Sequence, residues 1–184
     1  VPEYVPRDID QELSEKVAEL AERGGLLIII GDSTAGKSRS AYQALLRTVP
    51  DHRLITPYDR AELRDVLAYV AVTTEKSVLW LDDIERYLGN DGLTPRIAAQ
   101  LKSIGGVLVG TLRTEQYRGL SSFSAARSGA NSRRHDELLS FEDVLRQAIL
   151  IFMERRWTPA ETNRAQEIKD SRVLEALQHQ ETYG

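Results

Sequence analysis

One octapeptide, Gly31-Asp32-Ser33-Thr34-Ala35-Gly36-Lys37-Ser38, fits the phosphate-binding loop pattern GxxxxGK[ST]. It follows the apolar run at residues 26–30 and leads into a helical stretch at residues 40–46. In such a loop, the backbone N–H groups and the amino end of the next helix form a cradle for an anion. Lys37 can then reach the β- and γ-phosphates of a nucleotide, and the Ser38 hydroxyl can ligate Mg²⁺. The stretch therefore predicts a nucleotide-binding protein; the alternative is a glycine-rich turn that binds nothing.

Length and composition agree with this prediction and exclude other classes of site. The chain has 184 residues, which suits one domain with a sizeable core and room for a small appendage. Its net charge of −4 gives no general attraction to nucleic acid or to an anionic membrane. The absence of cysteine excludes disulfides and thiolate metal sites, and the three histidines lack metal-ligand spacing. A metal is therefore expected only together with the nucleotide.

The sequence carries no targeting signal. No apolar segment reaches the roughly 18 residues that span a bilayer, and the N-terminus lacks a basic region followed by an apolar core. We therefore expect a cytoplasmic protein without a membrane partner. The chain begins at Val1 rather than Met, which suggests a segment excised from a longer polypeptide.

Short apolar strands alternate along the chain with amphipathic helices, a pattern typical of a parallel sheet covered on both faces. Five strands are predicted, at residues 26–30, 53–56, 78–81, 107–111 and 148–153. The fifth is assigned as a strand because its run Ile149-Leu150-Ile151-Phe152 is continuously apolar and rich in β-branched residues. The predicted fold class is therefore α/β with three layers.

Helix starts are recognised from a capping residue, or from Pro at the first helical position, ahead of apolar residues at helical spacing. Such starts occur at Asp59…Glu62, at Thr94-Pro95 and at Thr158-Pro159-Ala160-Glu161. A further helix is expected before the first strand, from the apolar spacing of residues 13, 17 and 20. Residues 113–136 are rich in Ser, Gly, Ala and Arg and are predicted to form a long irregular loop that is either functional or mobile.

The C-terminal segment is expected to fold back as a lid near the nucleotide. Within residues 158–178, the apolar positions Ile168, Val173, Leu174 and Leu177 need a partner surface, and the sheet edge is the nearest one. We therefore divide the chain into a nucleotide-binding core with its N-terminal helix, residues 1–156, and a helical lid segment, residues 157–184.

A second motif is the apolar strand at residues 78–81, which ends in Asp82-Asp83 and is followed by Glu85. In a parallel sheet, ligands collect at the carboxyl ends of the strands. Asp82 is therefore expected beside the phosphate loop, where it could hold Mg²⁺ through water. Asp83 would orient or deprotonate a water that attacks the γ-phosphate, with Glu85 as the competing candidate. The alternative is that these acids only begin a turn or cap a helix.

A third motif is Gly110-Thr111-Leu112-Arg113, at the end of the strand predicted for residues 107–111. It delivers a hydroxyl and a guanidinium to the same edge of the sheet, and the planar, charged fork of Arg113 suits a γ-phosphate. The alternative is that Arg113 opens a solvated loop. The order of motifs is that of P-loop NTPases with an extra strand between the two nucleotide-binding strands, the ASCE type.

These motifs together resemble the NTPase domain of the STAND class, signal-transduction ATPases related to the AAA+ and apoptotic-regulator families. The resemblance is to bacterial members with the pattern GxSxAGKSR followed by WLDD, and it runs over nearly the whole chain. Gly31 to Arg39 resembles the Walker A motif, and Trp80 to Asp83 resembles the Walker B motif. Arg113 is similar to the strand-end arginine with which the family senses the γ-phosphate.

The resemblance extends to the N-terminus and to partners. Tyr4-Val5-Pro6-Arg7-Asp8 looks like a variant of a motif, usually an apolar pair followed by Gly-Arg-Glu, that lies against the nucleotide base. Pro6 stands for the Gly and Asp8 for the Glu, so Arg7 either contacts the base or ribose or belongs to an ordinary surface turn. Such domains normally lie between an effector and sensor repeats. The resemblance therefore implies effector and sensor domains in the parent chain and nucleotide-dependent self-association.

Our interpretation is a parallel sheet of strand order 5-1-4-3-2 that binds ATP or ADP with Mg²⁺ and hydrolyses ATP slowly, as the switch of a larger signalling or defence protein. Lys37, Asp83 and Arg113 are the predicted catalytic residues, and Ser38 and Asp82 the metal ligands. ATP is preferred to GTP because of the resemblance and because no Asn-Lys-x-Asp guanine motif occurs. One alternative is a small-molecule phosphotransferase.

A second alternative is a nucleotide-dependent DNA-binding module. The arginines of the predicted loop could touch nucleic acid, could act in trans on a phosphate as an arginine finger, or could belong to a solvated loop. These residues are Arg118, Arg127, Arg133 and Arg134.

Overall fold

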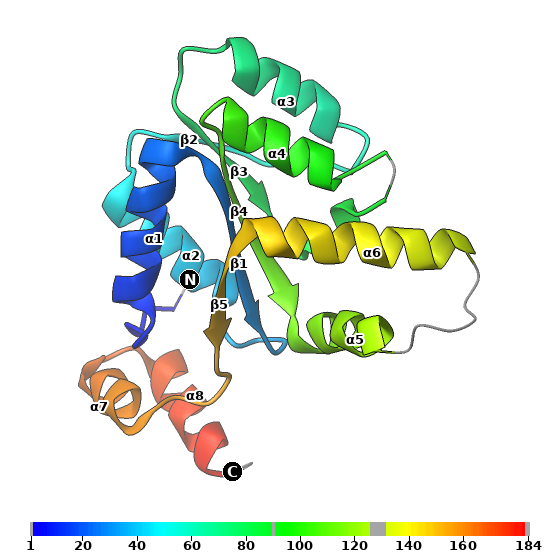
Figure 1. Ribbon diagram of the computed structural model, residues 1–184. Coiled ribbons are helices and arrows are strands. Elements are labelled where there is room, and N and C mark those ends of the chain that lie inside the picture. Colours follow the sequence, from blue (N-terminus) through cyan, green and yellow to red (C-terminus); the bar gives the residue numbers. More distant parts are fainter. Residues whose placement is uncertain (1, 90, 126–131, 183–184) are drawn as a thin grey trace.

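The computed structural model describes residues 2–89, 91–125 and 132–182, with the backbone alone for residues 120–125, 132–138 and 179–182. At the centre of the described residues is one sheet of five parallel strands in the order β2-β3-β4-β1-β5 (Figure 1). The strands are β1 (Gly25–Gly31), β2 (Arg53–Ile55), β3 (Ser77–Leu81), β4 (Val107–Arg113) and β5 (Ala148–Met153). The α/β class, the fifth strand and the strand order, counted from the other edge, are confirmed.

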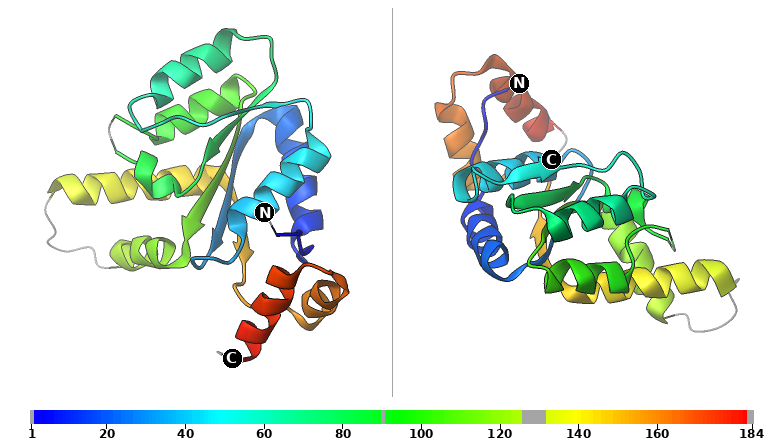
Figure 2. Two further views of the ribbon diagram at one scale, coloured as in Figure 1. Left: turned by 180° about the vertical axis from the view of Figure 1, so that it is seen from behind. Right: turned by 90° about the horizontal axis from the view of Figure 1, so that it is seen from above.

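Helices cover both faces of the sheet (Figures 1 and 2). One face carries α1 (Asp10–Arg23) and α2 (Lys37–Thr48), and the other carries α3 (Leu63–Val72), α4 (Pro95–Ser103) and α6 (Ser132–Gln147). Because side chains alternate along a strand, β1 contributes to both cores: Leu27 and Ile29 pack toward α1 and α2, whereas Ile28 and its neighbours on the same face pack toward α4 and α6. All seven residues of β1 are buried, which explains its continuous apolar run.

Two of the predicted helix starts have the expected caps. The Thr94 side chain accepts a hydrogen bond from the backbone of Ile97 at the start of α4. Thr158 and Glu161 form a complete capping box at the start of α7 (Pro159–Glu167). The third start is confirmed in part: Asp59 Oδ1 accepts from the Glu62 amide, but the Glu62 carboxylate accepts from the Tyr58 amide and α3 begins only at Leu63.

The prediction of an irregular loop over residues 113–136 is wrong for the part that the structure describes; residues 126–131 lie outside it. This segment contains α5 (Thr114–Ala125) and the first turns of α6. The α6 helix is held by Phe141, Val144 and Leu145, which are buried in the core shared with α4. Its amino-terminal half is polar, so its composition alone does not show the helix. Of the loop arginines, Arg118 lies on α5; Arg127 and the side chains of Arg133 and Arg134 lie outside the described residues.

Helices α7 and α8 (Ser171–Thr182) lie beyond the carboxyl end of the sheet, at the bottom of Figure 1. Their apolar partner is the N-terminal segment rather than the sheet edge, because Val5 forms a buried cluster with Ala165 and Val173. Trp157, Ile168 and Leu177 pack against this cluster, while Leu174 stays 42% exposed. Among the described residues, each helix is either too short or too polar to traverse a bilayer.

The burial of α6 can be tested with two phenylalanines. We expect Phe141→Ala to lower the free energy of unfolding by about 3–5 kcal/mol, because it removes a fully buried ring and leaves a cavity. Phe152→Ala is the matched control: that ring is 55% exposed and only meets the edge of Tyr117, so a loss of about 1 kcal/mol is expected. Urea denaturation measures both, and similar losses for the two variants would contradict the burial of α6.

Candidate functional site

The phosphate-loop sequence connects β1 to α2 at the carboxyl edge of the sheet. Its first residue, Gly31, packs so closely on β5 that an added Cβ would lie 2.5 Å from the Met153 carbonyl oxygen. Gly36 has a φ of +96°, a conformation that only glycine adopts at little cost in free energy, and it leads the loop into α2. Thr34 also has a positive φ, +64°, although it is β-branched. The loop is therefore held in an unusual conformation between two packed elements.

Lys37 is the first residue of α2 and is only 8% exposed. Its ammonium donates hydrogen bonds to the backbone carbonyls of Gly31, at 2.9 Å, and Asp32, at 2.8 Å. Burial lowers the pKa of Lys37, and the nearby carboxylates of Asp83 and Asp82 oppose that effect. The side chain thus folds back along the loop and places a positive charge inside its curve.

Ser38 and Asp82 meet although they are 44 positions apart in the sequence. The Ser38 hydroxyl donates to Asp82 Oδ1 at 2.7 Å, and the buried Thr111 hydroxyl donates to the same oxygen at 2.6 Å. The register of β3 and β4 explains the contact between Thr111 and Asp82. Leu81 of β3 is paired with Gly110 of β4, so Asp82, directly after β3, lies beside Thr111. A hydroxyl that donates to a carboxylate keeps its lone pairs for a cation.

The Asp83 carboxylate is paired with the Arg113 guanidinium in this structure. The Arg113 guanidinium donates to both Asp83 carboxylate oxygens, at 3.4 and 3.2 Å, and these hydrogen bonds raise the pKa of Arg113. Glu85 lies near the same guanidinium, with 4.0 Å between Glu85 Oε1 and Arg113 Nε. The two candidate bases therefore share one cation.

Glu85 is the more buried of the two acids. Burial raises its pKa, and its Oε2 atom has no hydrogen-bond partner among the described residues. Asp83 differs in its backbone, which is left-handed with φ +52° and ψ +65°. A carboxylate with an open acceptor site and a raised pKa suits a general base, so Glu85 stays the competitor of Asp83.

A pocket of about 240 Å³ opens beside the loop, between the N-terminal segment, α2 and α8. Its lining includes Tyr4, Ala35, Arg39, Met153 and Val173 and is more apolar than polar. Such a lining suits a flat ring. A larger, more open hollow of about 570 Å³ lies along β2 and α3 and contains none of the predicted site residues. We assign the site to the smaller pocket, because it adjoins the loop and the convergent polar groups.

Tyr4 and Arg39 form the outer wall of this pocket. The Tyr4 hydroxyl donates to Asp10 Oδ1 at 2.7 Å and accepts from the Ser40 hydroxyl at 2.9 Å, and burial raises the pKa of Tyr4. The Arg39 guanidinium lies 5.8 Å from the centre of the Tyr4 ring and donates to the Pro2 carbonyl. These contacts fix the N-terminal segment against the first turn of α2.

Arg7 makes two hydrogen bonds and one ion pair to three different segments, a set of contacts that we call the Arg7 clasp. Its guanidinium donates to the carbonyls of Ala35 and Glu154, both at 2.7 Å. Its Nε lies 2.9 Å from Glu161 Oε1, as an ion pair that is too bent for a hydrogen bond. The clasp joins the phosphate loop, the exit of β5 and α7. Arg7 also lines the pocket, and its contact with a base stays a prediction.

Asp8 ties the same segment to α7 a second time. Its carboxylate accepts hydrogen bonds from Arg164 and from Thr158 Oγ1, and its amide donates to Glu161. The hydrogen bond from Thr158 is the main reason that the pKa of Asp8 is lowered. The predicted helix cap Glu161 thus has a second role, as the buried counter-charge of Arg7, which its capping pattern does not indicate.

The structure brings the predicted residues Lys37, Ser38, Asp82, Asp83 and Arg113 to one edge of the sheet. Sequence reasoning missed the contact of Thr111 with Asp82, although alternation along the strands indicates it. Asp82 has the parity of Trp80, and Thr111 has the parity of Val109, so both face the layer of α1 and α2. Among the described residues, no group of three or more His, Cys, Asp or Glu side chains is placed to hold a metal. A divalent ion here would need ligands from a phosphate and from water.

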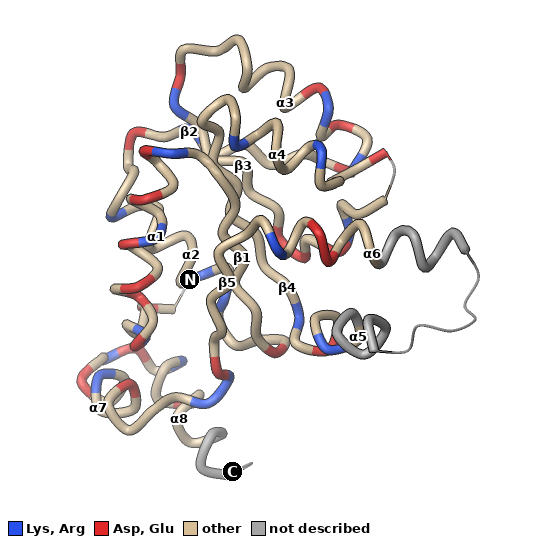
Figure 3. Tube along the Cα trace, viewed as in Figure 1, with Lys and Arg blue, Asp and Glu red and all other residues tan. Residues whose placement is uncertain are grey.

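Basic and acidic residues are interspersed along the elements in the view of Figure 3. Arg127 and the side chains of Arg133 and Arg134, on which the DNA-binding alternative rests, lie outside the described residues, so that alternative stays a prediction. Comparisons of the chain with models of protein families and with curated proteins find no match. The proposed function therefore rests on the arrangement of the side chains at the carboxyl edge of the sheet.

The Arg7 clasp makes a strong prediction for stability. Arg7→Ala should lower the free energy of unfolding by about 3–5 kcal/mol, because it leaves the buried Glu161 carboxylate without its counter-charge. The double variant Arg7→Met/Glu161→Leu should recover much of the loss, because no charge is then left unpaired. Thermal and urea denaturation measure these changes.

Arg53→Ala is the matched control for this prediction. It breaks an exposed ion pair with Glu75, at 3.2 Å, and should change stability far less than Arg7→Ala. If the two single variants unfold alike, Arg7 is an ordinary surface residue and the clasp does not exist.

Proposed function

We propose that this chain is an ATP-binding domain that hydrolyses ATP slowly with Mg²⁺, as the switch of a larger signalling or defence protein. The observation that carries the proposal is the hydrogen bond of 2.7 Å between Ser38 Oγ and Asp82 Oδ1. It joins the last residue of the phosphate-loop motif to the first acid after β3, the two positions that hold Mg²⁺ in P-loop NTPases. Assignment to the ASCE type and to the STAND class belongs to the same proposal and is supported by the strand order and the motif order.

The residues present fit a magnesium nucleotide. The first N–H groups of α2 have no partners within the helix, and together with Lys37 they would bind the phosphates. Ser38 and Asp82 would hold the metal, the latter through water. Mg²⁺, when bound, neutralises negative charge on the phosphates. The mainly apolar pocket beside Ala35 and Arg39 is the candidate place for the base.

The ion pair between Arg113 and Asp83 accounts for slow turnover. While Arg113 donates to both Asp83 oxygens, it competes with a water for that carboxylate, and Asp83 competes with a γ-phosphate for the guanidinium. The same exchange of partners serves both roles. The phosphate that attracts Arg113 therefore also frees the acid, so that the site is inhibited until a triphosphate is present.

The Arg7 clasp supports the switch part of the proposal. It links the loop carbonyl of Ala35 to Glu161 of α7, and α8 lines the pocket next to the loop. A change in the conformation of the loop on nucleotide binding would therefore be transmitted to α7 and α8, the two C-terminal helices, which serve as the lid. Phosphate release measured with and without candidate acceptors, alongside nucleotide calorimetry, tests the proposal. Transfer to an acceptor would favour a phosphotransferase instead.

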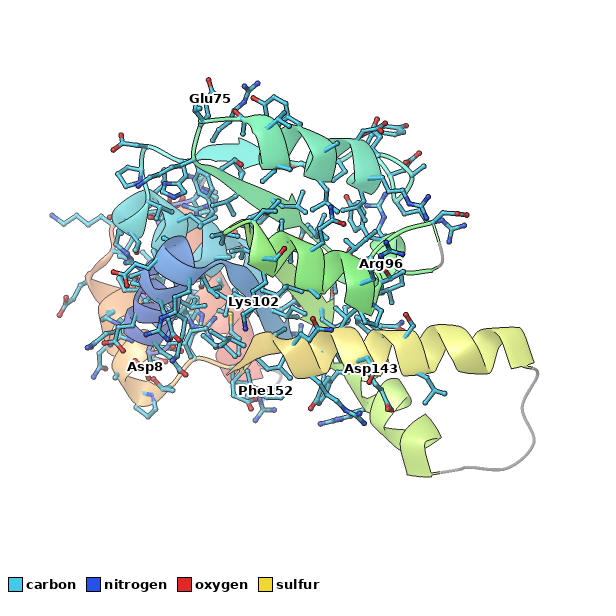
Figure 4. The ribbon with its side chains drawn as sticks, turned by 45° about the horizontal axis from the view of Figure 1, so that its top comes forward. Asp8, Glu75, Arg96, Lys102, Asp143 and Phe152 are labelled. Atoms are coloured by element: carbon cyan, nitrogen blue, oxygen red, sulfur yellow. The ribbon has the colours of Figure 1, made fainter. Side chains whose placement is uncertain are left out.

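Lys37→Ala should weaken ATP binding by about 10- to 100-fold, because a charged hydrogen bond contributes roughly 1.5–3 kcal/mol. Calorimetry measures the affinity, and circular dichroism shows that the variant is folded. Lys102→Ala is the control, since Lys102 is an exposed lysine of α4 (Figure 4). ATP affinity that is unchanged in a folded Lys37→Ala protein would overturn the phosphate-loop assignment.

The three acids separate into two classes of effect. Asp82→Asn should reduce the part of ATP affinity that depends on Mg²⁺. Asp83→Asn should leave ATP bound and lower turnover about 100-fold or more, because a general base contributes about 10²–10⁴ in rate. Single-turnover phosphate release measures the latter. If Glu85→Gln abolishes turnover while Asp83→Asn does not, Glu85 is the base.

A further inference from the structure

A single buried hydroxyl connects the two acids at the end of β3. Thr111 lies near the end of β4 and is 1% exposed. Its Oγ1 donates to Asp82 Oδ1 at 2.6 Å and accepts the Asp83 amide hydrogen at 3.0 Å. A buried threonine commonly satisfies its hydroxyl with one backbone carbonyl. Here the hydroxyl bridges a side chain and a backbone amide that belong to consecutive residues of the candidate site.

The bridge coincides with an unfavourable backbone conformation. Asp83 has φ +52°, a left-handed value that costs free energy for any residue with a side chain. A fixed acceptor for its N–H group stabilises that conformation and with it the direction in which the Asp83 carboxylate leaves the chain. Asp83 then reaches Arg113, at 3.2 Å. The Thr111 hydroxyl therefore contacts the backbone amide of Asp83 and the side-chain carboxylate of Asp82.

Thr111 is also more rigid than the other hydroxyl on Asp82. Ser38 lies at the exposed mouth of the loop, where a bound metal would use it as a ligand. Thr111 is in a strand that pairs with β1 on one side and with β3 on the other, and its β-branch restricts rotation about χ1. If Ser38 ligated a cation, Thr111 would still donate its hydrogen bond to Asp82.

We propose that Thr111 is a positioning residue for Mg²⁺ and for the attacking water. It orients Asp82 toward the metal and holds Asp83 in its left-handed conformation, without touching the nucleotide itself. This inference rests on the proposed function, because it assumes that Asp82 binds Mg²⁺.

The test compares Thr111→Val, which keeps the shape of the side chain but removes the hydroxyl, with Thr111→Ser, which keeps the hydroxyl. For each protein, ATP affinity is measured by calorimetry with Mg²⁺ and with EDTA, and exchange of the Asp83 amide hydrogen is measured by NMR without nucleotide. Thr48→Val, at the far end of α2, is the control for loss of a threonine hydroxyl.

We expect Thr111→Val to lower the gain in ATP affinity from Mg²⁺ by about 10- to 100-fold, the range found when a group that orients a metal ligand is removed. Affinity in EDTA should stay within about twofold of wild type. Thr111→Ser and Thr48→Val should keep the full gain. The Asp83 amide should be protected in the wild type and in Thr111→Ser, and should exchange rapidly in Thr111→Val.

Three results overturn the inference: an unchanged Mg²⁺ gain in Thr111→Val, an equal loss in Thr111→Ser, or an unprotected Asp83 amide in the wild type. If Thr111→Val does not fold, the serine variant and the wild-type amide still decide. If the wild type binds no nucleotide, the proposed function fails. The exchange measurement then shows separately whether Thr111 holds Asp83.

Discussion

The register of the three central strands determines where every polar group of the candidate site lies. Leu81 of β3 is paired with Gly110 of β4, and Gly31 of β1 is paired with Arg113. Asp82, the first residue beyond β3, therefore lies beside Thr111 of β4, and the phosphate loop leaves β1 beside Arg113. A shift of one residue would turn Asp82 or Thr111 to the opposite face, away from α2. The chemistry at this edge thus depends on backbone hydrogen bonds of the sheet as much as on the side chains that carry it.

Most of the sheet could be predicted from the sequence because strands buried on both faces need continuous apolar runs, as β1 and β4 have; the short edge strand β2, with Arg53 at its start, carries a weaker signal. The phosphate loop and the two acids could be placed because parallel strands end at one edge. The α6 helix was missed because its amino-terminal half is polar, although the helical spacing of Phe141, Val144 and Leu145 indicates its buried face. The partners of Arg7 could not be predicted: its contacts reach Glu154 and Glu161, and no local pattern reports a contact between such distant residues.

Departures from ordinary backbone geometry are concentrated at the site. Among the described residues, two that are not glycine have a positive φ, Thr34 in the loop and Asp83 after β3. Such conformations persist only where the surrounding structure holds them. Asp83 is held by Thr111, and the loop around Thr34 is held by the hydrogen bond of Arg7 to Ala35. The core stabilises a strained edge whose polar groups, in the proposed function, change partners when a nucleotide binds.

The Arg7 clasp has a consequence for how the chain is made. The hydrogen bond from Arg7 to Glu154 closes a separation of 147 residues, and contacts of that span form slowly because a long loop must first be closed. During synthesis Arg7 leaves the ribosome before its partner Glu161, so the ion pair between them can form only after α7 has been made. A polypeptide that ends between β5 and α7, at the boundary of the nucleotide-binding core, would therefore carry every group that is proposed to bind phosphate and yet leave Arg7 without its counter-charge.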